Sequence, residues 1–131
     1  MPDATKIPVD QASGPPASES SVIAEQFKGP AMILESAVLE VKSGLEMEFE
    51  AAFEQAQDII SGMAGYISHQ LQRCIEHPSR YLLLVNWANL EDHTVGFRES
   101  DEYKEWCRLL HHFYDPFPEV EHYQRVFNHS V

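Results

Sequence analysis

Positive charge is scarce in this chain. Nine lysines and arginines stand against 21 aspartates and glutamates in 131 residues, giving a formal net charge of −12. A surface this acidic repels the phosphate backbone, so we expect neither a nucleic acid nor an anionic membrane as partner. A neutral or aromatic small molecule stays compatible, because its pocket can be apolar inside an acidic exterior.

Cysteine and long apolar runs are also scarce. Cys74 and Cys107 lie far apart, too few for a disulfide framework or a zinc site, and we expect buried thiols. No apolar run approaches the roughly 20 residues of a membrane helix. The start, "MPDATKIPVD", lacks the basic and apolar regions of a signal peptide. The expected compartment is therefore the cytoplasm.

Several sequence motifs that are typical of a particular catalytic or binding function are absent as well. The chain has no Gly-x-Gly-x-x-Gly, no Walker A loop and no Gly-x-Ser-x-Gly elbow, so nucleotide binding and acyl transfer lack local support. Seven histidines invite a metal hypothesis, but no His-x-x-x-His pair occurs. The neighbouring His111 and His112 point to different helix faces, so we expect no metal site.

The chain divides into a tail and one domain. Residues 1–29 include "DQASGPPASESS", whose small, polar and proline residues show no hydrophobic period, and we predict a disordered tail. Residues 30–131 form the domain. Its patterns predict strands at 31–41, 65–76, 80–88 and 119–127, helices in 43–62 and 100–114, and a short helical stretch at 89–99.

Particular residues set these helix boundaries and faces. Ser43, with Glu46 three residues on, suggests a capping box for the first helix, and Ser100 is expected to cap the second. The first helix should bury the apolar residues Phe49, Phe53, Ala56 and Ile60, whose spacing is helical. Strict alternation in 65–76 would put Tyr66 and His69 on opposite faces of their strand.

The element order is strand, helix, strand, strand, helix, strand. That order is typical of the ferredoxin-like α+β fold, a four-stranded antiparallel sheet with helices on one face. Leu82 and Leu84 would place apolar side chains on the uncovered face. We therefore predict a homodimer that packs sheet to sheet.

Four residues are candidates for a site, each with a structural alternative. Trp87 ends the strand at 80–88 and either belongs to the core or lines a pocket. His93 follows closely and is either a surface residue or a general base. His111, beside the inner face of the second helix, is either a satisfied half-buried residue or a polar contact. His69 is expected in the core or at a dimer interface.

The segment "RYLLLVNWANLEDHTVGFRESDEYKEW" resembles a region of the antibiotic biosynthesis monooxygenase superfamily. There an apolar strand closes on Trp, a short acidic stretch follows, and Ser-x-x-Tyr/Phe opens a helix. "HHFYDPFPEVEHY" is similar to the segment before the last strand in some members, so the resemblance covers about residues 31–127. It implies a dimeric α/β barrel with a pocket between sheet and helices. It also implies oxidation of polyketide anthrones or quinols with O2 and without flavin, haem or metal.

The resemblance carries over only in part. Trp87 matches the pocket Trp, but Leu83 stands where anthrone-oxidising members have Asn, and His93 where they have Tyr. An Arg of those members is matched roughly by Cys107, with Arg108 next to it. Phe97 and Cys107 occupy the positions of the Trp and His of haem-degrading members, so haem degradation is not expected.

The sequence thus predicts a cofactor-independent monooxygenase acting on a small hydroxylated aromatic or quinol-like compound with O2. His93 would be the base, Trp87 the pocket wall and His111 a second polar contact. The rest of the pocket would come from Leu83, Phe97, Tyr103 and Cys107. Two alternatives stay open: a non-catalytic barrel that binds a small molecule or a partner, and an isomerase on the same fold.

Overall fold

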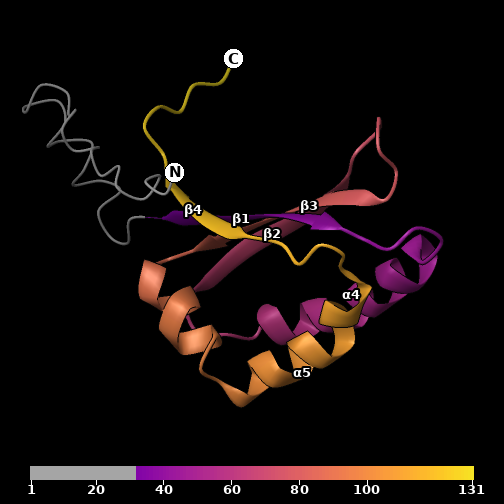
Figure 1. Cartoon of the computed structure of the whole chain (residues 1–131). Coiled ribbons are helices and arrows are strands. Elements are labelled where there is room, and N and C mark those ends of the chain that lie inside the picture. The colour runs from indigo at the N-terminus through magenta and orange to yellow at the C-terminus, as the bar shows by residue number, and fades with distance from the viewer. Residues whose placement is uncertain (1–31) are drawn as a thin grey trace, which may run out of the picture.

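The computed structural model describes residues 32–131, so the predicted tail at 1–29 lies outside the described residues (Figure 1). Four strands and two main helices follow one another in the predicted order, strand, helix, strand, strand, helix, strand. The elements are β1 (Ile33–Glu40), α4 (Glu46–Ile60), β2 (Tyr66–Arg73), β3 (Arg80–Trp87), the π-helical η1 (Asp92–Phe97), α5 (Asp101–Leu110), the 3-10 turn η2 (His111–Phe113) and β4 (Val120–Gln124).

The sheet has the strand order β2-β3-β1-β4, with every pair antiparallel. Figure 1 shows α4 and α5 together on one face of it. The ferredoxin-like α+β fold is thereby confirmed. Within residues 32–131, no helix is both long and apolar enough to cross a bilayer.

The α4 helix buries the predicted face but begins differently. Phe49, Phe53, Ala56 and Ile60 are all buried, as their spacing predicted. The predicted cap at Ser43 is wrong, because the helix starts at Glu46 after Leu45, which makes no side-chain cap. A turn at Gly44, with φ of +91°, separates Ser43 from the helix. The Glu46 carboxylate instead accepts hydrogen bonds from the Gly44 N–H and the Ser79 hydroxyl.

The β2 strand departs from strict alternation. An irregularity between Tyr66 and Ser68 shifts the register against β3, so Tyr66 and His69 come to the same face and the alternation is wrong there. The Tyr66 hydroxyl donates to His69 Nδ1 at 2.5 Å, and His69 Nε2 donates to Gln57 Oε1 at 2.9 Å. Both ring nitrogens are therefore hydrogen-bonded, Nδ1 within β2 and Nε2 to α4, which gives His69 a structural role.

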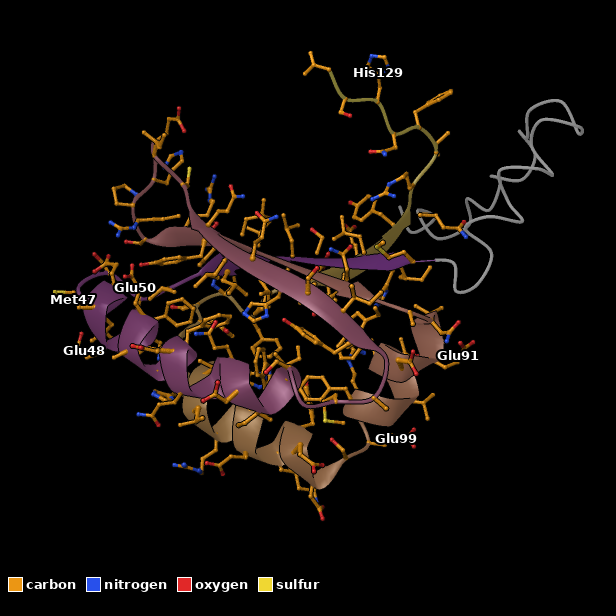
Figure 2. The ribbon with its side chains drawn as sticks, turned by 180° about the vertical axis from the view of Figure 1, so that it is seen from behind. Met47, Glu48, Glu50, Glu91, Glu99 and His129 are labelled. Atoms are coloured by element: carbon orange, nitrogen blue, oxygen red, sulfur yellow. The ribbon has the colours of Figure 1, made fainter. Side chains whose placement is uncertain are left out.

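The α5 helix begins as predicted, with the Ser100 hydroxyl accepting a hydrogen bond from the Tyr103 N–H. Its residues Trp106 and Leu110 enter the core between the helices and the sheet. Among residues 32–131 the acidic side chains other than Glu35 are exposed or half-buried, and Figure 2 shows Glu91 and Glu99 pointing away from the domain. The acidic excess is thus carried by the exterior, as the sequence predicted.

Candidate functional site

A cavity of about 740 Å³ lies between the sheet and α5. The inward side chains of β1 and β3 form its floor, because a strand turns alternate residues to the same face. Residues between the end of α5 and the start of β4 complete the lining. The lining residues with aromatic or ionisable side chains are Glu35, His93, Phe97, Arg98, Tyr103, Trp106, His111, Tyr114, Phe117, Glu119 and Glu121.

Glu35 is the buried acidic group of this cavity. It is only 5% exposed, on the inward face of β1 with Ala37 and Leu39. The indole N–H of Trp87 donates to Glu35 Oε1 at 2.9 Å, and His93 Nε2 lies 3.4 Å from the same oxygen. A carboxyl group is thus held at the cavity wall by two partners that come from outside its own strand.

Burial shifts the pKa values of this pair in opposite directions, because each neutral form is favoured in a poorly solvated site. Burial raises the pKa of Glu35 to about 7, against the opposing effects of the Trp87 hydrogen bond and the Arg98 charge. Burial lowers the pKa of His93 to about 3, helped by the charges of Arg98 and His122. Near neutral pH, Glu35 therefore exchanges a proton readily while His93 stays uncharged.

His93 is fixed from two further sides. Its ring stacks on Trp87, with centroids 5.4 Å apart and planes 21° from parallel. Its Nδ1 lies 2.9 Å from Nε2 of His122, the residue of β4 that is paired with Glu35 of β1. His122 is half-buried and does not line the cavity. Burial, and then the charge of Arg98, lowers the pKa of His122.

The η1 turn brings His93 to this place. It packs closely on the start of β2, where Gly65 has φ of +86° and a Cβ would lie 2.0 Å from Asp92 Oδ2. The Asp92 carboxylate in turn accepts the Asn89 N–H at 3.0 Å. Only glycine permits this approach, so the position of His93 depends on Gly65.

Aromatic rings continue the wall from His93 toward the end of α5. Phe97 and Tyr103 stand between His93 and His111, with successive centroid distances of 6.3, 5.1 and 6.1 Å. Burial lowers the pKa of His111 and raises that of Tyr103 to about 12, where Cys107 adds to the effect. The two cavity histidines are thus separated by two rings, and they do not form a pair.

Arg98 supplies positive charge at this cavity. It lines the cavity just after η1, and its charge lowers the pKa values of Glu35, His93 and His122. It forms no ion pair with any residue from 32 to 131. Arg98 and Arg108 are both exposed, but Arg108 does not line the cavity and is paired with Glu105 at 2.5 Å.

The structure brings together most of the site predicted from sequence. Leu83, His93, Phe97, Tyr103 and His111 all line the cavity. Two predicted members do not: Trp87 lies behind the wall with 0% exposure, and Cys107 is half-buried on α5. Sequence reasoning missed Glu35, Arg98 and His122. A glutamate on the same face as Ala37 and Leu39 was the one signal that pointed to Glu35.

Among residues 32–131, no group of three or more His, Cys, Asp and Glu side chains is arranged to hold a metal ion. The arrangement present is suited to acid–base chemistry. It offers a carboxyl with a pKa near neutrality, a neutral imidazole beside it, one cation and an aromatic wall.

Comparison with known proteins agrees with this architecture. YczJ of Bacillus subtilis is 62% identical over 95 residues, which are 72% of this chain and all of that protein. A crystal structure of an antibiotic biosynthesis monooxygenase homologue from Bordetella bronchiseptica has a TM-score of 0.71 at 37% identity, covering 74% of this chain and 99% of that one.

A more distant solved structure has the same fold. SnoaB of Streptomyces nogalater, a cofactor-independent oxygenase, has a TM-score of 0.59 at 15% identity, covering 77% of this chain and 97% of that one. Residues 32–109 match the family described as Antibiotic biosynthesis monooxygenase, and the resemblance found in the sequence is confirmed. The chain therefore belongs to the antibiotic biosynthesis monooxygenase family.

Proposed function

We propose that the chain is a cofactor-independent monooxygenase that oxidises a small hydroxylated aromatic or quinol-like compound with O2. The observation that carries this proposal is the buried Glu35–His93 pair on the wall of an aromatic cavity. The family and the fold shared with SnoaB, a cofactor-independent oxygenase, support the reaction type. The aromatic walls support the substrate class, because flat rings pack on flat rings.

Glu35 is the better candidate for the base, in place of His93. A general base is most effective when its pKa lies near the working pH. Burial raises the pKa of Glu35 to about 7, whereas it lowers that of His93 to about 3, which makes His93 a weak proton acceptor. His93 then acts as the partner that exchanges a proton with Glu35, and His111 contacts the far end of the substrate.

The proposed reaction needs only a proton acceptor and O2. Glu35 takes a proton from the activated ring carbon or its phenol, and the electron-rich anion reduces O2 and forms a carbon–oxygen bond. The resulting peroxide takes a proton back from Glu35. Loss of water then leaves a carbonyl, so that a CH2 group and O2 give a C=O group and H2O. The O–O bond breaks with one oxygen in each product.

Arg98 is placed to stabilise the anions that this sequence forms. A cation that already stands beside the reacting group favours a phenolate or a peroxide without further reorganisation. It lines the same cavity as Glu35 and His93, and its charge lowers the pKa values of both. Arg98 is thus a candidate cation of the site at a position other than Cys107 and Arg108, where the resemblance had roughly placed an Arg.

Oxygen uptake tests the proposal. Metal-stripped protein is given 1-naphthol derivatives, anthrones and quinols in an oxygen electrode. The Glu35→Gln variant is measured in parallel, and Glu54→Gln, at an exposed position on α4, is the matched control. We expect uptake that survives chelation and falls by about 10²-fold or more in Glu35→Gln, as for loss of a general base. Naphthoquinone-type products and water, without hydrogen peroxide, should account for the O2 consumed.

Other outcomes would replace the proposal. Proton exchange at a substrate carbon without oxygen uptake would identify an isomerase, because Glu35 and His93 can move a proton without O2. Saturable binding of these compounds without any product would identify a non-catalytic barrel.

We also infer that the chain works as a homodimer. Within residues 32–131 no helix covers the outer face of the sheet (Figure 1), and Val38 and Tyr123 are each 46% exposed there. Leu82 pairs with Val38 across β1 and β3, so the apolar side chains are adjacent. Light scattering should give twice the chain mass, and Leu82→Glu should give a monomer, whereas Met47→Glu, at an 81% exposed position on α4, should not. A wild-type monomer at micromolar concentration would overturn this inference.

A further inference from the structure

Three titratable side chains lead from the cavity to the edge of the sheet. Glu35 and His93 line the cavity, and His122 stands behind them on the edge strand β4, half-buried and outside the cavity lining. Glu35 Oε1 lies 3.4 Å from His93 Nε2, and His93 Nδ1 lies 2.9 Å from His122 Nε2. His93 therefore has one ring nitrogen toward Glu35 and the other toward His122, and His122 is itself partly exposed to solvent.

We propose that His122 is the outer member of a relay that carries protons between Glu35 and solvent through His93. The reaction that the relay would serve rests on the function proposed above. The relay itself is a property of the free protein. Its first contact, between Glu35 Oε1 and His93 Nε2, is about 0.5 Å longer than an ordinary N–H···O bond. Catalytic contacts of this kind tighten when substrate binds.

The transfer conserves protons and leaves His93 uncharged. The Glu35 O–H bond breaks as a bond forms to His93 Nε2, and the His93 Nδ1–H proton passes to His122 Nε2. The His122 Nδ1–H proton then leaves to water. Each ring changes tautomer but neither keeps a positive charge, which matters because a buried imidazolium is strongly disfavoured. Protonation of the peroxide runs the relay backward and restores the first tautomers.

In the proposed reaction Glu35 passes its proton to solvent before the peroxide forms and regains one for the peroxide, and it needs such a route because it has little access to water of its own. It is 5% exposed, and Trp87 and His93 contact its oxygen. A substrate in the cavity would cover the remaining side. The charged and titratable groups facing His122 are His93 and Arg98 on its helix side and Glu35 on the neighbouring strand. The charge of Arg98 favours departure of the proton from His122.

A purely structural role for His122 makes a different prediction. If His122 only holds the His93 ring, any side chain that hydrogen-bonds to His93 Nδ1 should replace it. The amide of His122→Gln can accept from or donate to His93 Nδ1 but cannot pass a proton onward. The relay therefore predicts loss in His122→Gln, and the structural role predicts none.

The substrate-free test follows exchange of the His93 ring proton with water by NMR on protein labelled with ¹⁵N-histidine. We expect exchange to slow by about 10-fold or more in His122→Gln, in line with loss of a proton-transfer group. His77→Gln, in the exposed turn between β2 and β3, is the matched control and should leave exchange unchanged. Equal exchange rates in wild type and His122→Gln would overturn the relay.

A second test uses His122→Ala and added imidazole with the best compound of the oxygen-uptake panel. The relay predicts a lower kcat that imidazole restores in a concentration-dependent way, with KM nearly unchanged. Full activity in His122→Ala, or loss that imidazole does not restore, would contradict it. If wild type consumes no O2 but ring-proton exchange still depends on His122, the proposed function fails and the relay stands.

Discussion

The indole N–H of Trp87 donates to Oε1 of Glu35 at 2.9 Å, joining residues that are 52 positions apart in the chain. The tryptophan that ends β3 therefore acts on a buried carboxyl, and it does not line the cavity itself. Because the bond favours the ionised carboxylate, it lowers the pKa of Glu35 against the larger effect of burial. Trp87 thus keeps that pKa close to neutrality.

Replacing Trp87 should shift the pH dependence of the reaction. Trp87→Phe removes the N–H donor, so the pKa of Glu35 should rise further and the acid limb of the kcat/KM profile should move to higher pH. The loss of this bond should also cost about 1–3 kcal/mol of stability. Carboxyl ¹³C NMR of Glu35 measures the pKa directly. Trp106→Phe removes an indole that is not bonded to Glu35 and should not move it; an unchanged pKa in Trp87→Phe would contradict the prediction.

Glu35 should make the protein less stable as pH rises. Its pKa is about 7 in the folded state against 4.5 as the reference, so the folded state binds more protons between these values. Stability from Glu35 is therefore fully present below about pH 4.5 and is lost as pH rises through 7, by about 3 kcal/mol in all. His93 acts oppositely, since its lowered pKa favours the folded state above pH 6.5 and that stability is lost as pH falls toward 3.

Urea unfolding of wild type and Glu35→Gln from pH 4.5 to 8 isolates the carboxyl contribution, because His93 is common to both proteins. We expect the stability of wild type relative to Glu35→Gln to fall steadily with rising pH. The opposite slope would mean that Glu35 and His93 form a charged pair in the folded state.

The parts of the fold that follow a local period could be predicted from sequence. The helical spacing of Phe49 and Phe53 and the cap at Ser100 depend on near neighbours, and both are confirmed. The turn at Gly44 and the irregularity after Tyr66 depend on backbone geometry that an apolar pattern does not encode. These are the places where the predicted cap and the predicted strand face are wrong.

The candidate site shows the same division. His93 and Trp87 are six residues apart, and their proximity was visible in the sequence. The place of Glu35 in the site could not be predicted, because both faces of β1 carry apolar residues. Alternation alone therefore does not tell which face of β1 is inward. Its partners Trp87 and His122 come from β3 and β4, and only the sheet order brings them to it.

Arg98 and Arg108 offer a matched pair of arginines. Arg98→Met removes the cation of the cavity, so the pKa values of Glu35, His93 and His122 should all rise and kcat should fall by about 10²-fold, as for loss of one oxyanion-stabilising group. Arg108→Met removes an exposed arginine paired with Glu105, and it should change neither these pKa values nor kcat. Oxygen uptake and histidine NMR titrations measure both effects. Equal activity in the two variants would remove Arg98 from the proposed site.

Gly65 and Gly44 offer a second matched pair, because both have positive φ, of +86° and +91°. Alanine at either position should cost about 1–2 kcal/mol for the backbone conformation alone. Gly44 has no atom within 4 Å of an added Cβ, whereas at Gly65 the Cβ would lie 2.0 Å from the Asp92 carboxylate and 2.6 Å from the Asp92 Cβ. Asp92 must therefore move as a whole, and with it the turn that carries His93.

We expect Gly65→Ala to lose at least about 2 kcal/mol more stability than Gly44→Ala in urea unfolding, as for other changes that force a steric overlap. At temperatures where both variants stay folded, Gly65→Ala should also weaken the contact between His93 Nδ1 and His122, visible as a changed His93 tautomer in ¹⁵N NMR. Gly44→Ala should keep the wild-type tautomer. Equal stabilities and identical histidine spectra in the two variants would show that Gly65 does not position His93.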